Sequence, residues 1–251
     1  MQFIRNFAPM KIVISPSTIP SFNLAVEEYL FTRRGESFFL LYRNDPSVII
    51  GSNQAVVNEV DQDYCIEHEI RILRRISGGG AVYHDRGNLN YSLLYDKSET
   101  PLSTRFLEPV VAVLRSLSIP VEIGKRKDLW LTGRKISGTA SHVSVHRELH
   151  HGTLLYDTDL EVLQRALASE NSKLIRKATA SVPSPVTNIR NYLAAQNRDD
   201  VDTRSFVERF TRELLHYYGE EELTPLPADA LEQIQQLQKE KYSARSWNYR
   251  L

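Results

Sequence analysis

The sequence predicts an α/β protein of the α+β type, in which helices flank a mixed, mainly antiparallel sheet. Short apolar runs of strand length alternate with longer segments whose apolar residues recur at helical spacing. The turns between the predicted strands are short, which favours antiparallel pairing over the long crossovers of a parallel sheet. At 251 residues the chain can bury a sizeable core, and we expect a single domain over residues 1–251.

The first half of the chain is predicted to interleave strands with helices. Apolar residues recur on one helical face from Phe22 to Arg33, with Ser21 as the expected N-cap. A turn at Asn44-Asp45-Pro46 separates two short strands. The predicted strands are Lys11–Ile14, Phe38–Tyr42, Val48–Ile50, Ile70–Ile76 and Ala81–Tyr95, and a second helix spans Asp61–Glu69.

The second half is predicted to contain more helix. The pair Gly133-Arg134 is the expected turn of a hairpin, so that Lys135 opens the returning strand. Gly219 suits the position just after a helix, because glycine readily adopts a left-handed backbone. The predicted helices are Thr104–Leu117, Leu160–Leu167, Ser205–Tyr218 and Ala228–Lys241, and the predicted strands are Val121–Ile123, Leu129–Leu131 and His150–Tyr156.

The composition excludes several classes of protein. Lys plus Arg number 31 and Asp plus Glu number 31, so a general nucleic-acid binder is not expected. No run reaches the roughly 18 apolar residues of a membrane span, and the N-terminus lacks the apolar core of a signal peptide. One cysteine, Cys65, fits a reducing compartment. We therefore expect a cytoplasmic protein without nucleic-acid or membrane partners.

A local basic patch stands out against this balance. It comprises Gly124-Lys125-Arg126-Lys127 and Arg134-Lys135. Such a patch could attract an acidic protein partner or a phosphate.

The most informative segment is the glycine loop that follows Arg74-Arg75-Ile76-Ser77. Gly78, Gly79 and Gly80 lack a Cβ, so their backbone can approach a ligand closely. Arginine adds a rigid fork of donors suited to phosphate or carboxylate. The dinucleotide-binding fingerprint is excluded, because a strand and not a helix is predicted to follow. A simple hairpin turn remains the alternative when the glycines are considered alone.

Two further motifs favour a ligand-binding loop over a simple hairpin turn. They are GRKISGTA at residues 133–140 and HHGTLL at residues 150–155, and they follow RRISGGGAVYHDRGN at residues 74–88. The three motifs in this order resemble the lipoate–protein ligase A family. The resemblance extends from Phe22–Glu28, similar to the family's first helix, to Ser246–Tyr249, similar to the close of its catalytic domain.

The resemblance implies a fold and an activity. The fold is the one shared by biotin ligases and class II aminoacyl-tRNA synthetases. The activity is the ATP-dependent activation of lipoate or octanoate as an acyl-adenylate, followed by transfer to a lysine of a carrier. The implied carriers are the lipoyl domains of 2-oxoacid dehydrogenase complexes and the glycine cleavage H protein. Mg²⁺ would enter with ATP and be held mainly by phosphates, so a protein metal cage is not expected.

The resemblance also implies roles for individual residues. Lys135 is the expected catalytic residue, because a fixed cation stabilises charge that develops during acyl transfer. Arg75 is expected to contact the nucleotide phosphate. The residues expected to bind lipoate and ATP, as lipoyl-adenylate, are Arg75, Ser77, Gly78, Gly79, Gly80, Ala81, Val82, Tyr83, Lys135, Ser137, Gly138 and Ala140. Further expected cleft contacts are Glu27, His84, Asn88, Asp128, His151 and Gly152.

Alternatives stay open at this point. The chain ends where two-domain members continue into a small accessory domain associated with adenylation, so we expect that domain to be absent. A separate accessory protein could then complete the enzyme. One alternative is a cysteine-independent octanoyl or lipoyl amidotransferase, since no cysteine follows Cys65 to carry an acyl-thioester. Another is a non-catalytic, lipoate-binding regulatory relative, although Lys135 and the three glycines argue against a pure binder.

Overall fold

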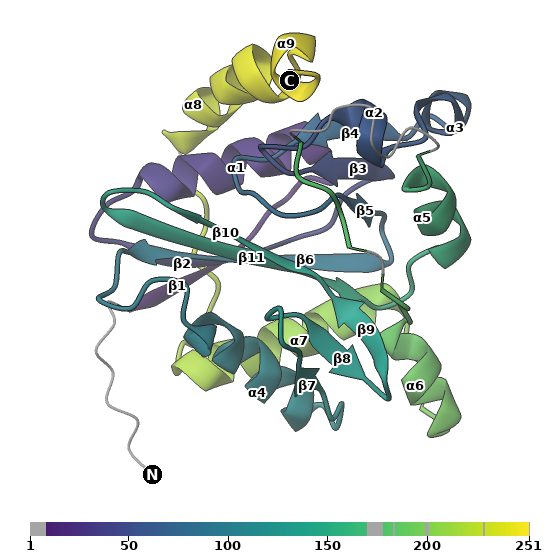
Figure 1. Cartoon of the computed structure of the whole chain (residues 1–251). Helices are drawn as coiled ribbons and strands as arrows, with labels where there is room; N and C mark the ends of the chain where they lie inside the picture. Colours follow the sequence, from purple (N-terminus) through teal and green to yellow (C-terminus); the bar gives the residue numbers. More distant parts are fainter. Residues whose placement is uncertain (1–8, 170–177, 183, 199–200, 228, 251) are drawn as a thin grey trace.

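The structure is a computed structural model that describes residues 9–169, 178–182, 184–198, 201–227 and 229–250. Its centre is a five-stranded sheet in the order β1-β2-β6-β11-β10 (Figure 1). These strands are β1 (Met10–Ile14), β2 (Ser37–Tyr42), β6 (Asn88–Asp96), β11 (Arg147–Leu155) and β10 (Thr139–Val143). Only the β1–β2 pair in this sheet is parallel, so the prediction of a mixed, mainly antiparallel sheet is confirmed.

Two small sheets flank the central one. The first has the order β4-β3-β5 and contains β4 (Arg71–Arg74), β3 (Ser47–Ile50) and β5 (Val82–His84). The second has the order β7-β8-β9 and contains β7 (Glu122–Ile123), β8 (Leu129–Leu131) and β9 (Arg134–Ser137). In Figure 1 these small sheets lie on opposite sides of the central sheet. Each small sheet therefore adds strands and loops on one side of the central sheet.

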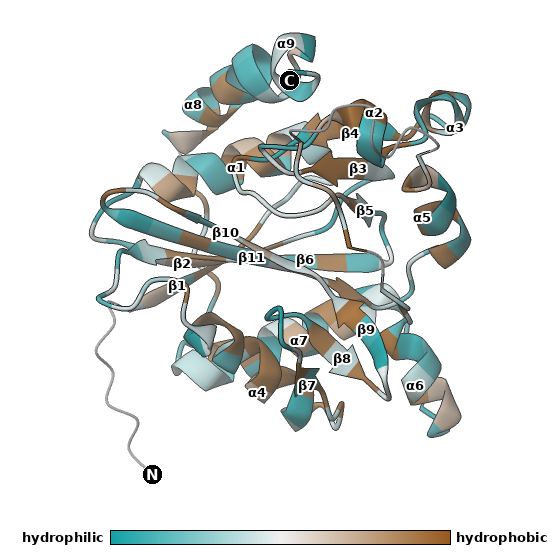
Figure 2. Ribbon diagram, in the orientation of Figure 1, coloured by the Kyte–Doolittle hydropathy of each residue, from teal (hydrophilic) through white to brown (hydrophobic). Residues whose placement is uncertain are grey.

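Helices cover both faces of the central sheet. The alternation of strand side chains sends Phe38 and Leu40 toward α1, and Phe39 and Leu41 toward α4 and α7. The hydrophobic stretches of α4 and β3 are plain in Figure 2. The helices are α1 (Pro20–Thr32), α2 (Val56–Glu59), α3 (Gln62–Glu67), α4 (Glu108–Ser116), α5 (Leu160–Ala166), α6 (Ile189–Ala195), α7 (Thr203–Tyr218), α8 (Ala230–Leu237) and α9 (Arg245–Asn248), with a 3₁₀ turn η1 (Thr104–Leu107) and a π-helical turn η2 (Gln238–Tyr242).

Two predicted helix boundaries are confirmed by their caps. The Asp61 side chain accepts a hydrogen bond from the amide of Tyr64 at the start of α3. Gly219 ends α7 with a left-handed φ of 69°. The prediction of Ser21 as an N-cap is wrong, because α1 already begins at Pro20 and Ile19 occupies the N-cap position without a side-chain hydrogen bond.

Local turn chemistry explains the other differences. The hairpin turn is Thr132-Gly133, both with positive φ, so Arg134 opens β9 and Lys135 is its second residue. The predicted strand Ala81–Tyr95 is divided into β5 and β6 by a turn in which Asp85 accepts a hydrogen bond from Gly87. Helix α6 had no predicted counterpart. Ala228, the first residue of the last predicted helix, lies outside the described residues.

Candidate active site

A cavity of about 320 Å³ lies between α1, the glycine loop, β9–β10 and the face of the central sheet that α1 covers. Most of the residues singled out in the sequence surround it. The predicted binding residues on its wall are Arg75, Gly79, Gly80, Ala81, Val82, Lys135, Gly138 and Ala140, together with the predicted cleft contacts His84, Asp128, His151 and Gly152. Segments far apart in sequence thus meet around one space.

Other predicted residues lie outside the cavity wall. Tyr83 alternates to the opposite side of β5, where it packs in a separate apolar cluster with Val48 and Ile50. The remaining ones are buried behind the wall, and they are Glu27, Ser77, Asn88 and Ser137. Gly78 is also absent from the wall, although its carbonyl belongs to the loop that forms it. None of these predicted binding positions lines the cavity in this structure.

The glycine loop is held in place by Arg75. Its Nη2 donates to the carbonyls of Gly78 at 2.5 Å and Gly80 at 2.8 Å, and its Nη1 donates to the carbonyl of Ile49 at 2.9 Å. Between these anchors Gly79 adopts a φ of 85°, a region that side chains with a Cβ rarely enter. Burial lowers the pKa of Arg75 to about 10, so the guanidinium still carries its charge at neutral pH. Because these hydrogen bonds occupy most of the N–H groups of Arg75, few of its donors remain for a ligand.

A buried chain of hydrogen bonds supports the loop from behind. Ser77 Oγ lies 2.6 Å from His151 Nε2, and His151 Nδ1 lies 2.8 Å from Glu27 Oε1. Ser92 donates to the same carboxylate oxygen at 2.6 Å. Burial alone would raise the pKa of Glu27, but His151 and these hydrogen bonds bring it below its ordinary value. The carboxylate is thus kept ionised inside the protein.

Two residues that line the cavity, His84 and Asn90, each carry a buried N–H group without a partner among the described residues. Asn23 donates to Asn44 Oδ1 at 2.8 Å, so the Asn44 amide nitrogen faces His84 Nδ1 at 3.0 Å as the donor. Burial lowers the pKa of His84 to about 3, so the ring is neutral and its proton sits on Nε2. That Nε2, like Asn90 Nδ2, has no hydrogen-bond acceptor in the described part of the chain. A ligand oxygen would satisfy either group.

Lys135 is the cation nearest to a buried carboxylate in this wall. Its Nζ lies 3.6 Å from Asp128 Oδ2, and Asp128 is almost fully buried. The backbone of Lys135 is fixed by the segment 185–187, since its N–H donates to the carbonyl of Pro185 and its carbonyl accepts from the amide of Thr187. Burial lowers the pKa of Lys135, whereas Asp128 opposes that shift by favouring the charged form. The lysine is therefore held at a defined place in the wall.

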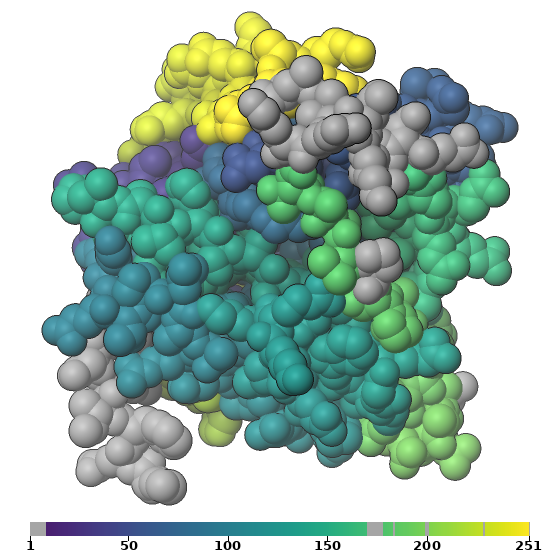
Figure 3. All heavy atoms as spheres, in the orientation of Figure 1, coloured from purple at the N-terminus to yellow at the C-terminus, as the bar shows by residue number. Residues whose placement is uncertain are grey.

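The segment 178–182 closes one side of the cavity. Ser181 Oγ donates to a Glu59 carboxylate oxygen and accepts from Gln54 Nε2 at 3.2 Å and from the Ala81 amide at 3.0 Å. Figure 3 shows green atoms of this part of the chain on the same face of the molecule as the teal atoms of residues that follow residue 120. The segment is thereby tied to the end of the glycine loop.

Sequence reasoning missed part of the wall. Tyr42, Asn90 and Thr153 are direct neighbours across β2, β6 and β11, and all three line the cavity. A polar Asn90 inside an apolar strand was a usable signal, but the strand register that groups the three was not visible in the sequence. The other wall residues that were missed are Leu24, Ile49, Arg126, Thr139, Thr179, Ala180, Ser181 and Val182.

The described residues contain no group of three or more His, Cys, Asp or Glu side chains that could hold a metal ion. Among the same residues, no helix has the length and apolar character needed to cross a membrane.

Comparison with known proteins decides the family. The profile of the lipoyl protein ligase A/B catalytic domain matches residues 19–215. The chain is 38% identical over 238 residues to lipoate–protein ligase 1 of Staphylococcus aureus, covering 92% of this chain and 70% of that protein. The chain belongs to the lipoyl protein ligase A/B catalytic-domain family. A second family member, the lipoate–protein ligase LplJ of Bacillus subtilis, is 36% identical over 240 residues, with the same 92% and 70% coverage.

Solved structures of family members have the same fold. A putative lipoate protein ligase from T. acidophilum, solved with bound lipoic acid, has a TM-score of 0.78 at 26% identity and covers 97% of this chain and 99% of its own. A lipoate–protein ligase A bound with ATP has a TM-score of 0.79 at 26% identity, covering 97% and 98%. The family predicted from the three motifs is therefore confirmed.

Proposed function

We propose that this chain attaches lipoate to a lysine of a carrier domain by way of an acyl-adenylate made with ATP. The observation that carries the proposal is Lys135, held beside Asp128 in the wall of a cavity that the glycine loop also lines. Related structures with bound lipoic acid and with ATP support the choice of reactants.

In the first half-reaction, a carboxylate oxygen of lipoate attacks the α-phosphorus of ATP and pyrophosphate leaves. Negative charge then builds on the phosphate oxygens, where a fixed cation stabilises it. Lys135 supplies that cation, and the backbone of Gly79 and Gly80 lets the anionic group approach without side-chain interference.

The residues of this site fit a magnesium ion that binds together with ATP. Asp128 offers one buried carboxylate oxygen, Oδ2, that lacks a hydrogen-bond donor among the described residues. One or two carboxylates together with substrate phosphates form the usual Mg²⁺ environment. When bound, the ion would neutralise phosphate charge, and Asp128 is the residue that would help hold it.

In the second half-reaction, the uncharged amine of the acceptor lysine attacks the acyl carbon. The bond from that carbon to the AMP oxygen breaks, and AMP leaves. The charge on Lys135 lowers the pKa of the incoming amine, which favours its uncharged form. Asp128, 3.6 Å from Lys135 Nζ, is placed to accept the proton that the amine loses.

The acceptors we propose are lipoyl domains of 2-oxoacid dehydrogenase complexes and the glycine cleavage H protein. A bi-partite lipoate protein ligase from T. acidophilum has been solved in a study that includes its E2 lipoyl domain, which supports the first of these. This chain covers 70% of the length of the ligases from Staphylococcus aureus and Bacillus subtilis. A separate accessory protein that improves adenylation is a further partner that we propose.

The deciding experiment mixes the protein with lipoate, ATP, magnesium and an unmodified lipoyl domain, and follows the mass of that domain. A lipoyl increment that requires ATP supports the proposal. Pre-formed lipoyl-adenylate in place of lipoate and ATP isolates the second half-reaction, and single-turnover rates compare the two. Transfer from the adenylate alone would place adenylation with a second protein.

Two alternative outcomes are distinguishable in the same assay. Modification from an acyl-thioester donor without ATP would indicate the cysteine-independent octanoyl or lipoyl amidotransferase. Tight lipoate binding without modification from any donor would indicate a non-catalytic regulatory relative. Octanoate replaces lipoate in a parallel reaction to measure the preference between the two acids.

A further inference from the structure

A second, shallower groove of about 290 Å³ opens beside the active-site cavity, along the β7–β8 turn. Arg126 and Asp128 line both spaces, so the groove is continuous with the cavity mouth. Its other side chains are the exposed Glu122 and Lys125, Ile123, which is 44% exposed, and the half-buried Trp130. A macromolecule that inserts one side chain into the cavity would rest on this surface.

The rim of the groove carries cations without carboxylate partners. Lys125 and Arg126 line the groove, and Arg134 lies on β9 next to the Lys135 that pairs with Trp130. All three are exposed, and none of them forms an ion pair within the described part of the chain. The groove also carries two carboxylates, Glu122 and Asp128, and Asp128 is already paired with Lys135. Three cations therefore face one carboxylate that is unpaired among the described residues, which leaves a local excess of positive charge on a chain whose formal net charge is zero. We call Ile123, Lys125, Arg126, Trp130 and Arg134 the basic ledge.

The turn that carries the ledge is rigidly tied to the cavity wall. Lys127 adopts a left-handed φ of 61°, its carbonyl accepts from Thr139 Oγ1 at 2.7 Å, and its ammonium donates to the carbonyl of Leu102. The Gly124 amide donates to the Asp128 carbonyl at 2.8 Å, and a Cβ at Gly124 would collide with the side chains of Asp128 and Trp130. Anything bound to the ledge is therefore positioned against the residue that pairs with Lys135.

We propose that the basic ledge docks the acceptor domain through carboxylates that surround its target lysine. This rests on the proposed function and names the surface that selects its protein substrate. A lysine entering beside Lys135 and Arg126 meets like charge, so carboxylates around that lysine are needed to make the approach favourable. The same cations lower the pKa of the incoming amine and favour its reactive form. Ile123 and Trp130 add apolar contact area at the centre of the surface.

The test is the double variant Lys125→Glu/Arg134→Glu, whose positions do not line the cavity. Transfer from pre-formed lipoyl-adenylate to an isolated lipoyl domain is measured at several ionic strengths. The KM for the acceptor should rise about tenfold or more at low salt, since rim charges act mainly on association. The dissociation constant of lipoyl-adenylate should stay unchanged. The acceptor KM of the unmodified protein should rise with salt, and that of the variant should not.

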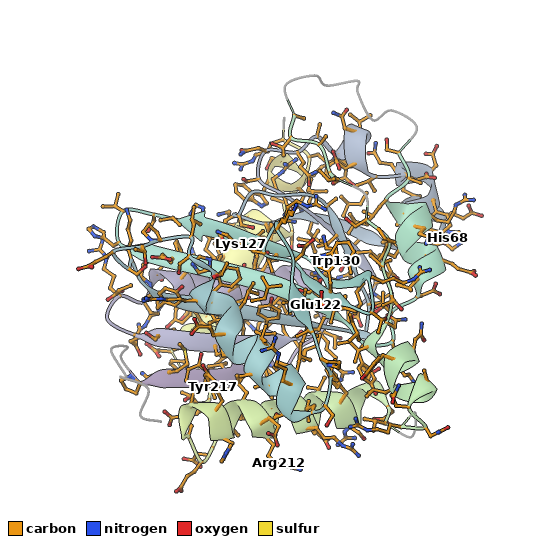
Figure 4. All side chains as sticks on the ribbon, turned by 60° about the horizontal axis from the view of Figure 1, so that its bottom comes forward. His68, Glu122, Lys127, Trp130, Arg212 and Tyr217 are labelled. Carbon is orange, nitrogen blue, oxygen red and sulfur yellow. The ribbon has the colours of Figure 1, made fainter. Side chains whose placement is uncertain are left out.

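The matched control is Arg212→Glu on α7, which Figure 4 shows well away from Lys127, Trp130 and Glu122. It makes a similar charge change on an exposed residue outside the ledge, and the acceptor KM should not change. A lipoyl domain whose carboxylates next to the target lysine are changed to lysines should restore a low KM with the double variant. Unchanged KM in the double variant, or an equal rise in the control, would overturn the proposal.

Failure of the proposed function is separable from failure of docking. If no protein form transfers lipoate, the binding of the unmodified lipoyl domain is titrated directly by calorimetry. Loss of that binding in the ledge variant alone still supports the docking surface, and equal binding by all forms overturns it.

Discussion

Each face of the central sheet carries a buried histidine paired with a glutamate, and the two pairs have different surroundings. His150 and His151 are adjacent on β11 and point to opposite faces, because strand side chains alternate. His150 Nε2 lies 2.8 Å from Glu148, and His151 Nδ1 lies 2.8 Å from Glu27. Both carboxylates have a pKa below the ordinary value despite their burial. Pairing alone therefore does not mark a functional histidine.

What surrounds each pair makes the difference. The ring of His150 stacks on Phe106 at 4.4 Å, and Ser98 donates two hydrogen bonds to Glu148, so this pair is closed within the α4 face. His151 instead borders the cavity and supports the glycine loop through Ser77. We call these the α4 face and the cavity face. The comparison teaches that a buried pair contributes to ligand binding when a cavity lies beside it, and to stability when packing encloses it.

The largest expected effect is on the cavity side. Lys135→Met should reduce lipoyl transfer about a hundredfold or more, because a fixed cation at the developing charge is lost. The protein should still fold, because a Met stem can occupy the space of the lysine stem, but its melting temperature should fall, because the buried Asp128 loses the cation beside it. Rates with pre-formed lipoyl-adenylate and thermal melts check both statements. Lys97→Met, at an exposed position just after β6, is the matched control and should keep full activity. Near-normal transfer by a folded Lys135→Met protein would remove Lys135 from the mechanism.

The glycine loop gives the next largest effect. Gly79→Val should weaken lipoyl-adenylate binding more than it lowers stability. A Cβ there lies 3.1 Å from Arg75 Nη2 and 3.3 Å from Ala140 Cβ, and the φ of 85° is strained for valine. Gly78→Val is the control, because a Cβ at Gly78 meets nothing within 4 Å. Calorimetric titration of both variants separates them, and equal binding by both would reduce the loop to an ordinary turn.

Part of the fold and of the candidate site could be predicted from the sequence, and part could not. The three motifs led to the family and the mainly antiparallel sheet, because strand periodicity and glycine placement are local properties. They did not reveal that Arg75 holds the loop carbonyls, since that depends on where residues 49 and 80 meet in space. The grouping of Asn90 with Tyr42 and Thr153 depends on strand register, which the sequence does not display. Only three-dimensional contacts, and not composition, distinguish the residues that line the cavity from those that hold the lining residues in place.

A matched pair of substitutions tests the two faces directly. Glu27→Gln should weaken ligand binding by roughly tenfold with a smaller loss of stability, because the loop support loses its charge. Glu148→Gln should leave binding unchanged and lower the free energy of unfolding by about 1–3 kcal/mol, since one buried hydrogen bond is lost. Urea unfolding and lipoyl-adenylate titration are run on both. If Glu27→Gln affects only stability, the two pairs are equivalent and the comparison fails.

The pH dependence of stability sharpens the role of His84, which borders the cavity. Its folded pKa is about 3, against an ordinary 6.5. Below pH 6.5 the unfolded chain binds a proton that the folded chain does not, so stability falls as pH decreases toward 3. The slope contributed by this residue approaches about 1.4 kcal/mol per pH unit. Urea unfolding of His84→Gln between neutral and mildly acid pH should show a shallower decline than the unchanged protein, and identical slopes would contradict the assignment.

The smallest expected effect lies outside both faces. Cys65 is 1% exposed in the cluster that contains Val48, Ile50 and Tyr83, and burial raises the pKa of its thiol to about 11. The thiol therefore stays protonated and unreactive at neutral pH, since the thiolate is the nucleophile. Cys65→Ser should keep full transfer activity and lose about 1 kcal/mol of stability, because a hydroxyl replaces a small apolar group in that cluster. Intact-mass analysis during turnover should find no acyl group on Cys65. A trapped acyl-thioester there, or loss of transfer by a folded Cys65→Ser protein, would place acyl chemistry outside the cavity and undo the contrast between the two faces.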